Sequence, residues 1–172
     1  STIDIRSEDN VVKKFSGGAG INMINGDFFV KIPMSPKMSL QVSGRRSIAD
    51  LFKTPTYDQY FERTFSNTDV AGISSANDTL LTTDENFYFY DLNLKLMVDL
   101  SENDKLRVNF LGFRNEISYQ ENATKNNTTE SKTSNLSQQN TSAGLSYHHL
   151  WSKRVKTVFE AYYSDYKLES TN

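Results

Sequence analysis

The feature that most constrains the fold is the strict alternation of apolar and polar residues over positions 86–100. The even positions carry Tyr88, Tyr90, Leu92, Leu94, Leu96, Val98 and Leu100, whereas the odd positions include Asp91, Asn93, Lys95 and Asp99. A period of two predicts a β-strand with one apolar and one polar face. This strand would extend about 45 Å, whereas strands of soluble domains usually have about 5 to 6 residues. A bilayer requires spanning strands of about 9 to 11 residues with aromatic side chains at its interfaces, so the pattern favours a membrane strand.

The bulk composition is compatible with a membrane barrel and excludes several other classes. The chain has a mean hydropathy of −0.59, 37% hydrophobic residues and no run of about 18 apolar residues that could form a membrane helix. This composition remains compatible with a barrel, because half of the residues in each barrel strand face water. A net charge of −2 gives no reason to expect a nucleic-acid partner. The absence of cysteine excludes disulfide scaffolds, thiolate metal sites and cysteine nucleophiles.

Six further segments show features of strands. They are residues 12–24, 27–33, 38–47, 106–119, 139–151 and 155–168, which with residues 86–100 make seven expected strands. Asn25-Gly26 is a typical hairpin turn, and Gly112 marks the point where alternation fades, which suggests a bulge. On the last segment, alternation predicts that Thr157, Phe159, Ala161 and Tyr163 share the outer face.

The connections between these strands alternate in length. Short ones cover residues 35–37, 101–105 and 152–154, and long ones cover residues 48–85 and 120–138. Residues 120–138 are almost wholly polar, which predicts a mobile loop. Outer-membrane barrels have short periplasmic turns and long extracellular loops. Trp151, beside a short turn, would then lie in the periplasmic aromatic girdle. The competing architecture is a soluble β-sandwich, which also has alternating strands and hairpins.

Several segments resemble TonB-dependent outer-membrane receptors, particularly those of Bacteroidetes. They are I-D-I-R-S (3–7), K-F-S-G-G-A-G-I-N (14–22), D-F-F-V-K-I-P (27–33) and Q-V-S-G-R-R-S-I-A-D-L-F (41–52), with F-Y-F-Y-D-L-N-L-K-L, E-N-D-K-L-R-V-N-F-L and S-N-L-S-Q-Q-N further on. In that family an I-D-I-type strand closes the plug domain and a glycine-rich segment starts the barrel. An S-G-R-R-type strand then leads into a long extracellular loop.

The resemblance implies an all-β, antiparallel transmembrane β-barrel segment of about seven to eight long strands. Residues 1–11 would be the last plug strand with its link, and residues 12–172 the first part of a 22-stranded barrel, so the chain is expected to be a fragment. A small closed barrel of eight strands is the alternative if residues 2–7 pair as a strand. The implied partners are the remainder of the barrel and plug, the lipid bilayer of the bacterial outer membrane, an inner-membrane energy-coupling protein and a surface lipoprotein lid.

No catalytic, metal or cofactor site emerges from the residues, and no enzyme activity is expected. His148 and His149 fall on opposite faces of one strand, and Glu8-Asp9 and Asp84-Glu85 are interpreted as solvated turn charges. Two groups of candidates remain. Residues expected on the lumen face, to hold the plug or line a solute path, are Arg45, Asp91, Lys95, Arg107 and Glu160. Loop residues expected to contact a ligand or a lid are Tyr57, Tyr60, Phe61 and Phe65.

Three functions follow, in order of preference. The first is part of a TonB-dependent transporter that imports an iron chelate, a glycan or a peptide through a plugged barrel. The second is a non-transporting barrel or interaction component of a larger outer-membrane assembly. The third is a soluble β-sandwich that binds a partner.

Overall fold

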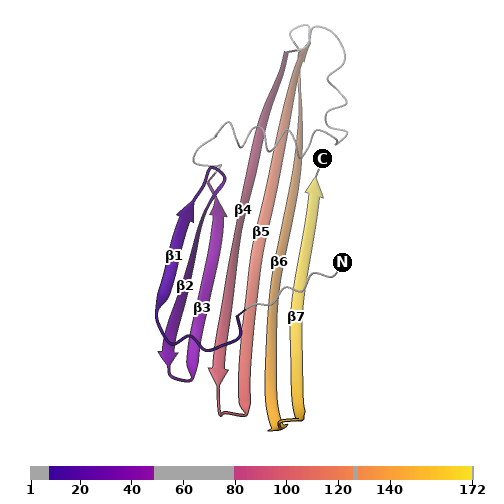
Figure 1. Cartoon of the computed structure of the whole chain (residues 1–172). Coiled ribbons are helices and arrows are strands. Elements are labelled where there is room, and N and C mark those ends of the chain that lie inside the picture. The colour runs from indigo at the N-terminus through magenta and orange to yellow at the C-terminus, as the bar shows by residue number, and fades with distance from the viewer. Residues whose placement is uncertain (1–7, 49–79, 126–127, 172) are drawn as a thin grey trace, which may run out of the picture.

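The described part of the chain is a single antiparallel sheet of seven strands. The structure is a computed structural model and describes residues 8–48, 80–125 and 128–171. The strands are β1 (Ser16–Ile21), β2 (Asn25–Ser35), β3 (Met38–Ser47), β4 (Leu80–Asp99), β5 (Asp104–Lys125), β6 (Thr128–Ser152) and β7 (Val155–Thr171). They lie side by side in chain order, each paired with the next, and β4 to β6 reach well beyond β1 to β3 (Figure 1). The expected all-β class with about seven to eight antiparallel strands is confirmed, although β1 has only 6 residues.

The first hairpin turn lies three residues before its expected position. Asn25-Gly26 was expected to form the turn, but both residues belong to β2, and Ile21 pairs with Gly26. The turn is made by residues 22–24, because the Asn22 side-chain oxygen accepts hydrogen bonds from the backbone N–H groups of Ile24 (2.8 Å) and Asn25 (2.9 Å). A side chain that bonds the backbone two residues on stabilises such a turn without glycine.

The polar segment 120–138 is not a loop, contrary to expectation. β5 continues to Lys125 and β6 begins at Thr128, so this segment forms the distal half of a long hairpin with an unbroken register. The β5–β6 pairing continues to Lys125 and Thr128, and the many threonines of this hairpin are compatible with strands. In the other expected loop, residues 80–85 belong to β4, while residues 49–79 lie outside the described part.

The bulge expected at Gly112 is also absent. Gly112 pairs with Leu92 on one side and Thr141 on the other without a register shift. Within the described ladders, the shifts occur at Pro33/Ser35 and Leu150/Ser152, beside two short turns. The turn at residues 36–37 lies where the sequence predicts it.

The cross-strand register divides the side chains into two faces of different character. One, hereafter the apolar face, carries Phe28, Val30, Ile32, Leu40, Val42, Leu92, Leu94, Leu96, Val98, Leu106, Val108, Phe110, Ala143, Leu145, Phe159 and Ala161. The opposite, polar face carries Lys31, Ser39, Gln41, Ser43, Arg45, Asp91, Asn93, Lys95, Arg107, Asn109, Ser142, Ser146, Glu160 and Ser164. The expected sharing of one face by Thr157, Phe159, Ala161 and Tyr163 is consistent with the β6–β7 pairing.

The sheet has almost no hydrophobic core of its own. Among the described residues, Met97 is the one fully buried hydrophobic side chain, whereas Phe28, Leu92, Leu145 and Phe159 on the apolar face are between 36% and 58% exposed. A β-sandwich would cover this face with a second sheet, but the described strands form one sheet only. The apolar face is therefore uncovered within the described structure.

Candidate functional site

The candidate site is the place where residues 8–12 cross the polar face of the sheet. In Figure 1 the indigo segment that precedes β1 runs across the lower part of the sheet, in front of strands that follow it in the chain. It is held there by both its side chains and its backbone. At its end, the Val12 N–H donates to the Oγ of Ser39 on β3 (3.0 Å), and Ser39 is completely buried.

Arg107 on β5 is the centre of this contact. Its side chain is 3% exposed, and all five of its N–H donors have an acceptor. Nε bonds the Asp9 carboxylate and Nη2 bonds the Asp9 carbonyl oxygen, both at 2.8 Å. Nη2 also bonds the Asp99 carboxylate (2.8 Å), and Nη1 bonds the carbonyl oxygens of Val98 (3.0 Å) and Leu106 (2.9 Å). The guanidinium therefore joins residues 8–12 to the β4–β5 hairpin.

Two lysines hold the start of the same segment. The Lys31 ammonium on β2 lies 2.5 Å from the Glu8 carboxylate. Lys95 on β4 donates to the Glu8 carbonyl oxygen (2.5 Å) and lies 3.9 Å from the Asp9 carboxylate. Lys95 is largely buried, with 12% of its side chain exposed, whereas Glu8 and Asp9 are about half exposed.

The sequence interpretation of Glu8-Asp9 as solvated turn charges is wrong. Both residues are bound to cations of the polar face, although they lie 23 to 98 positions away in sequence. The signal that could have revealed this is charge complementarity. An acidic pair ahead of the first strand can match the two lysines and the arginine that alternation places on one face. Only the topology brings these residues together.

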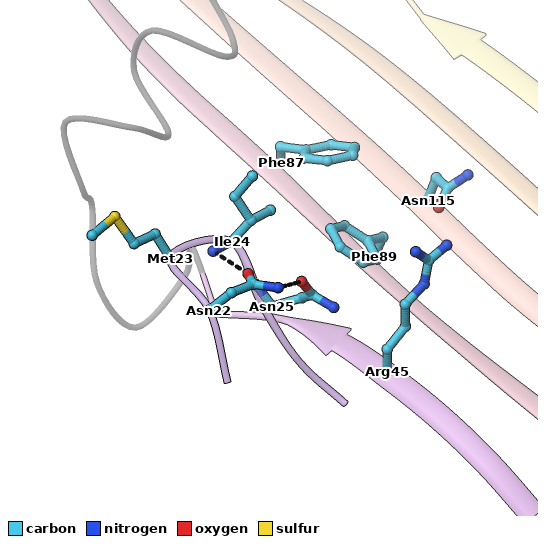
Figure 2. Close-up of a pocket in the computed structure, with 8 residues that line it drawn as sticks. All are labelled: Asn22, Met23, Ile24, Asn25, Arg45, Phe87, Phe89 and Asn115. Carbon is cyan, nitrogen blue, oxygen red and sulfur yellow. Dashed lines mark hydrogen bonds between the residues drawn. The ribbon is translucent and has the colours of Figure 1, made fainter. Parts of the chain in front are cut away.

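A second cluster lies on the polar face near the β1–β2 turn. The Arg45 side chain forms an ion pair with Asp91 and lies 5.5 Å from the centre of the Phe89 ring. Figure 2 shows Arg45 and Phe89 beside an open hollow of about 620 Å³, which is also lined by Phe87, Asn115 and residues 22–25.

The remaining candidates are not part of these clusters. Glu160 is exposed on β7, on the polar face opposite Ser146, and forms no recorded ion pair within the described residues. Tyr57, Tyr60, Phe61 and Phe65 lie outside the described residues. Of the five polar-face candidates, Lys95 and Arg107 meet at residues 8–12, and Arg45 and Asp91 form the second cluster.

Polar and aromatic groups border the apolar face at both ends. At the β4–β5 turn, Asp104 accepts hydrogen bonds from Ser101, Tyr147 (2.5 Å) and His149 (2.5 Å), which hold its pKa well below the ordinary value of 3.8. Trp151 packs edge-on against His149, with ring centres 4.3 Å apart.

At the opposite border, Tyr88 and Tyr90 pack with ring centres 6.0 Å apart. The Arg46 guanidinium lies 5.3 Å from the Tyr88 ring. One cross-strand row at this border consists of Arg46, Tyr90, Arg114, Gln139 and Lys167. Polar and charged groups thus replace apolar ones at this end of the face.

The described residues contain no group of three or more histidine, aspartate or glutamate side chains arranged to hold a metal ion. His149 pairs with Asp104, whereas His148 contacts the Ser146 hydroxyl through Nε2 (2.7 Å) on the opposite face. In the same part of the chain, no helix has the length and apolarity needed to cross a membrane.

Comparisons with known proteins give one structural likeness. No family model and no curated protein matches the sequence. Among solved structures, the chain is similar to a major outer membrane protein from Thermus thermophilus. The two share 13% sequence identity, and the likeness covers 91% of this chain and 82% of that chain, with a TM-score of 0.32. A TM-score this low does not define a common fold.

Proposed function

We propose that this chain forms part of the wall of an outer-membrane β-barrel, with the apolar face toward lipid and the polar face toward a lumen. The observation that carries the proposal is the uncovered apolar face on strands of 17 to 25 residues, β4 to β7. A soluble protein rarely exposes so large a continuous apolar surface. Lipid is the environment that covers such a face without a second protein layer.

The dimensions of the apolar face fit a bilayer. It runs from Tyr90 on β4 to Leu100, the residue after that strand, which is ten residue steps or about 33 Å. At the strand tilt of about 40° found in barrels, this corresponds to a depth of about 25 Å, the height of the apolar band in outer-membrane proteins. The tyrosines and arginines at one border, and Trp151 with His149 at the other, correspond to the two interfaces.

The polar face supports a plugged lumen rather than an open channel. Residues 8–12 lie on it and are held by Arg107, Lys95 and Lys31, so a segment that precedes the first strand covers part of the face that we assign to the lumen. We infer that this segment links the wall to a plug, as the resemblance to TonB-dependent receptors implies. The finer proposal is a transporter that imports an iron chelate, a glycan or a peptide.

The transporter would act with the remainder of its barrel and plug, an inner-membrane energy-coupling protein and a surface lipoprotein lid. The edge strands β1 and β7 each have one paired neighbour in the described sheet, and further wall strands would cover their free edges. A non-transporting barrel component would share the wall but not the uptake.

Two experiments test these proposals separately. The wall proposal predicts that the protein fractionates with the outer membrane and resists alkaline extraction, and release into the soluble fraction would refute it. The transport proposal predicts that deletion of the protein abolishes uptake of one class among labelled iron chelates, oligosaccharides and oligopeptides. That uptake should stop when an uncoupler collapses the proton gradient. Unchanged uptake of all three classes would favour the non-transporting role.

A further inference from the structure

A small hollow on the polar face lies beside the contact made by Glu8. It has a volume of about 300 Å³ and is lined by Lys31, Gln41, Ser43, Asn93, Lys95 and Asn109, among others. Gln41 occupies the centre of this group, because it pairs with Lys31 on β2 and with Lys95 on β4. Three nitrogen-bearing side chains therefore stand in one cross-strand row.

The Gln41 side chain lacks an acceptor. Its Nε2 atom is buried, and it has no hydrogen-bond partner among the described residues. A buried donor without an acceptor is destabilising and rare in folded proteins, so such a group often marks a place where a further molecule binds. A molecule that binds at this position has to accept a hydrogen bond from Gln41 and fit between two ammonium groups.

The charge of the hollow depends on residues 8–12. Glu8 and Asp9 neutralise Lys31, Lys95 and Arg107 together with Asp99. When residues 8–12 leave the sheet, Asp99 is the one acidic partner that remains among these six residues. Within this group, three cationic side chains then face one carboxylate.

We propose that this hollow is a binding site for an oxyanionic solute that carries two or more carboxylate or phosphate groups. Glu8 acts as an internal competitor, because its carboxylate and carbonyl oxygen occupy the two lysines that the solute would bind. One oxyanion of the solute accepts the Gln41 N–H between Lys31 and Lys95, and residues 8–12 are displaced. This inference depends on the proposed lumen, and it specifies the charge of the solute, which the proposed function leaves open.

The test monitors residues 8–12 in the protein reconstituted in lipid vesicles. Asn10 is exposed and the chain has no cysteine, so Asn10→Cys accepts a single spin label. Citrate and tripolyphosphate are each titrated, with sodium chloride at equal ionic strength and sucrose as controls. We expect both oxyanions to mobilise the label at an ionic strength roughly tenfold lower than chloride requires, since a specific ion pair with hydrogen bonds exceeds simple screening.

Two variants separate binding from docking. Gln41→Leu removes the unpaired donor but keeps the Glu8 contacts, so the label should stay immobile while citrate affinity, measured by calorimetry, falls about fivefold. The double variant Lys31→Gln/Lys95→Gln should lower the sodium chloride concentration that mobilises the label, although Arg107 and Ser39 still hold the segment, and should abolish calorimetric binding. Glu160→Gln, on the same face of β7, is the matched control and should change neither readout.

The outcomes distinguish this proposal from the wall proposal. If citrate, tripolyphosphate and chloride mobilise the label equally at equal ionic strength, charge screening alone explains the response and the proposed site is refuted. An unchanged citrate affinity in Gln41→Leu would also refute it. A response to one oxyanion alone supports the site and identifies its ligand as carboxylate or phosphate. Membrane fractionation and alkaline extraction do not depend on anion binding. A protein that is inserted in the membrane but does not bind these anions would therefore contradict the anion site and leave the wall proposal intact.

Discussion

Replacement of Arg107 by glutamine should release residues 8–12 from the sheet. The guanidinium makes two of its five hydrogen bonds to Asp9, one to the carboxylate and one to the carbonyl oxygen, both at 2.8 Å. Glutamine is too short to reach both groups and carries no charge. The segment would then retain the contacts of Glu8 with the two lysines and the bond from Val12 to Ser39.

The size of the effect follows from these two bonds. A hydrogen bond to a charged group contributes about 1.5 to 3 kcal/mol when buried, but Asp9 is 53% exposed, which reduces the value for its carboxylate. Together the two bonds contribute about 2 to 3 kcal/mol to docking of the segment. Because 1.36 kcal/mol corresponds to a factor of ten, the undocked population should rise about 30- to 150-fold.

Hydrogen exchange at the Val12 amide measures this population, since that N–H donates to buried Ser39. The Val12 exchange rate should rise by the same factor in Arg107→Gln. Exchange at Leu96, within the β4 ladder, should stay slow and so show that the sheet is intact. Glu160→Gln should match the unchanged protein. An unchanged Val12 rate in Arg107→Gln, with Leu96 still protected, would refute the role of Arg107 as the anchor.

Three further predictions concern the two faces and the edges of the sheet. Leu94→Lys should destabilise the protein in vesicles by about 2 to 4 kcal/mol in denaturant titrations, whereas Asn93→Lys on the polar face should cost far less. Because the pKa of Asp104 lies below 3.8, its cluster stabilises the fold fully above that pH and loses its contribution as the pH falls further. Asp104→Asn should therefore flatten the acid limb of stability measured against pH. Gly17→Ala would place a Cβ 2.9 Å from a backbone oxygen of β2 and should expose β1 to proteolysis, whereas Gly26→Ala meets nothing closer than 3.8 Å and should not.

Alternation predicts the central parts of β2 to β7 and the two faces of the sheet. Along β4 the apolar positions are so regular that parity assigns Asn93 and Leu94 to opposite faces, and antiparallel pairing extends this assignment to the neighbouring strands. The distal half of the β5–β6 hairpin could not be predicted in the same way. Its residues are polar on both faces, so no period of two in hydrophobicity distinguishes strand from loop there.

The candidate site was predictable only in part. Parity places Lys95 and Arg107 on the polar face, because each strand is regular around them. The partners Glu8 and Asp9 precede the first strand, where no period applies, and their contacts depend on the path of a segment without secondary structure. The unpaired Gln41 donor depends on packing, which a sequence pattern does not encode.

The central claim is that lipid covers one face of this sheet and water the other. Single cysteines at Leu92, Leu94 and Leu145 on the apolar face, and at Asn93 and Ser142 on the polar face, test it directly in vesicles. We predict that a charged maleimide modifies the two polar-face cysteines, whereas the three apolar-face cysteines stay unmodified and are quenched by brominated lipid when labelled with a fluorophore before insertion. Modification of the apolar-face cysteines at the same rate as those at positions 93 and 142 would contradict the claim.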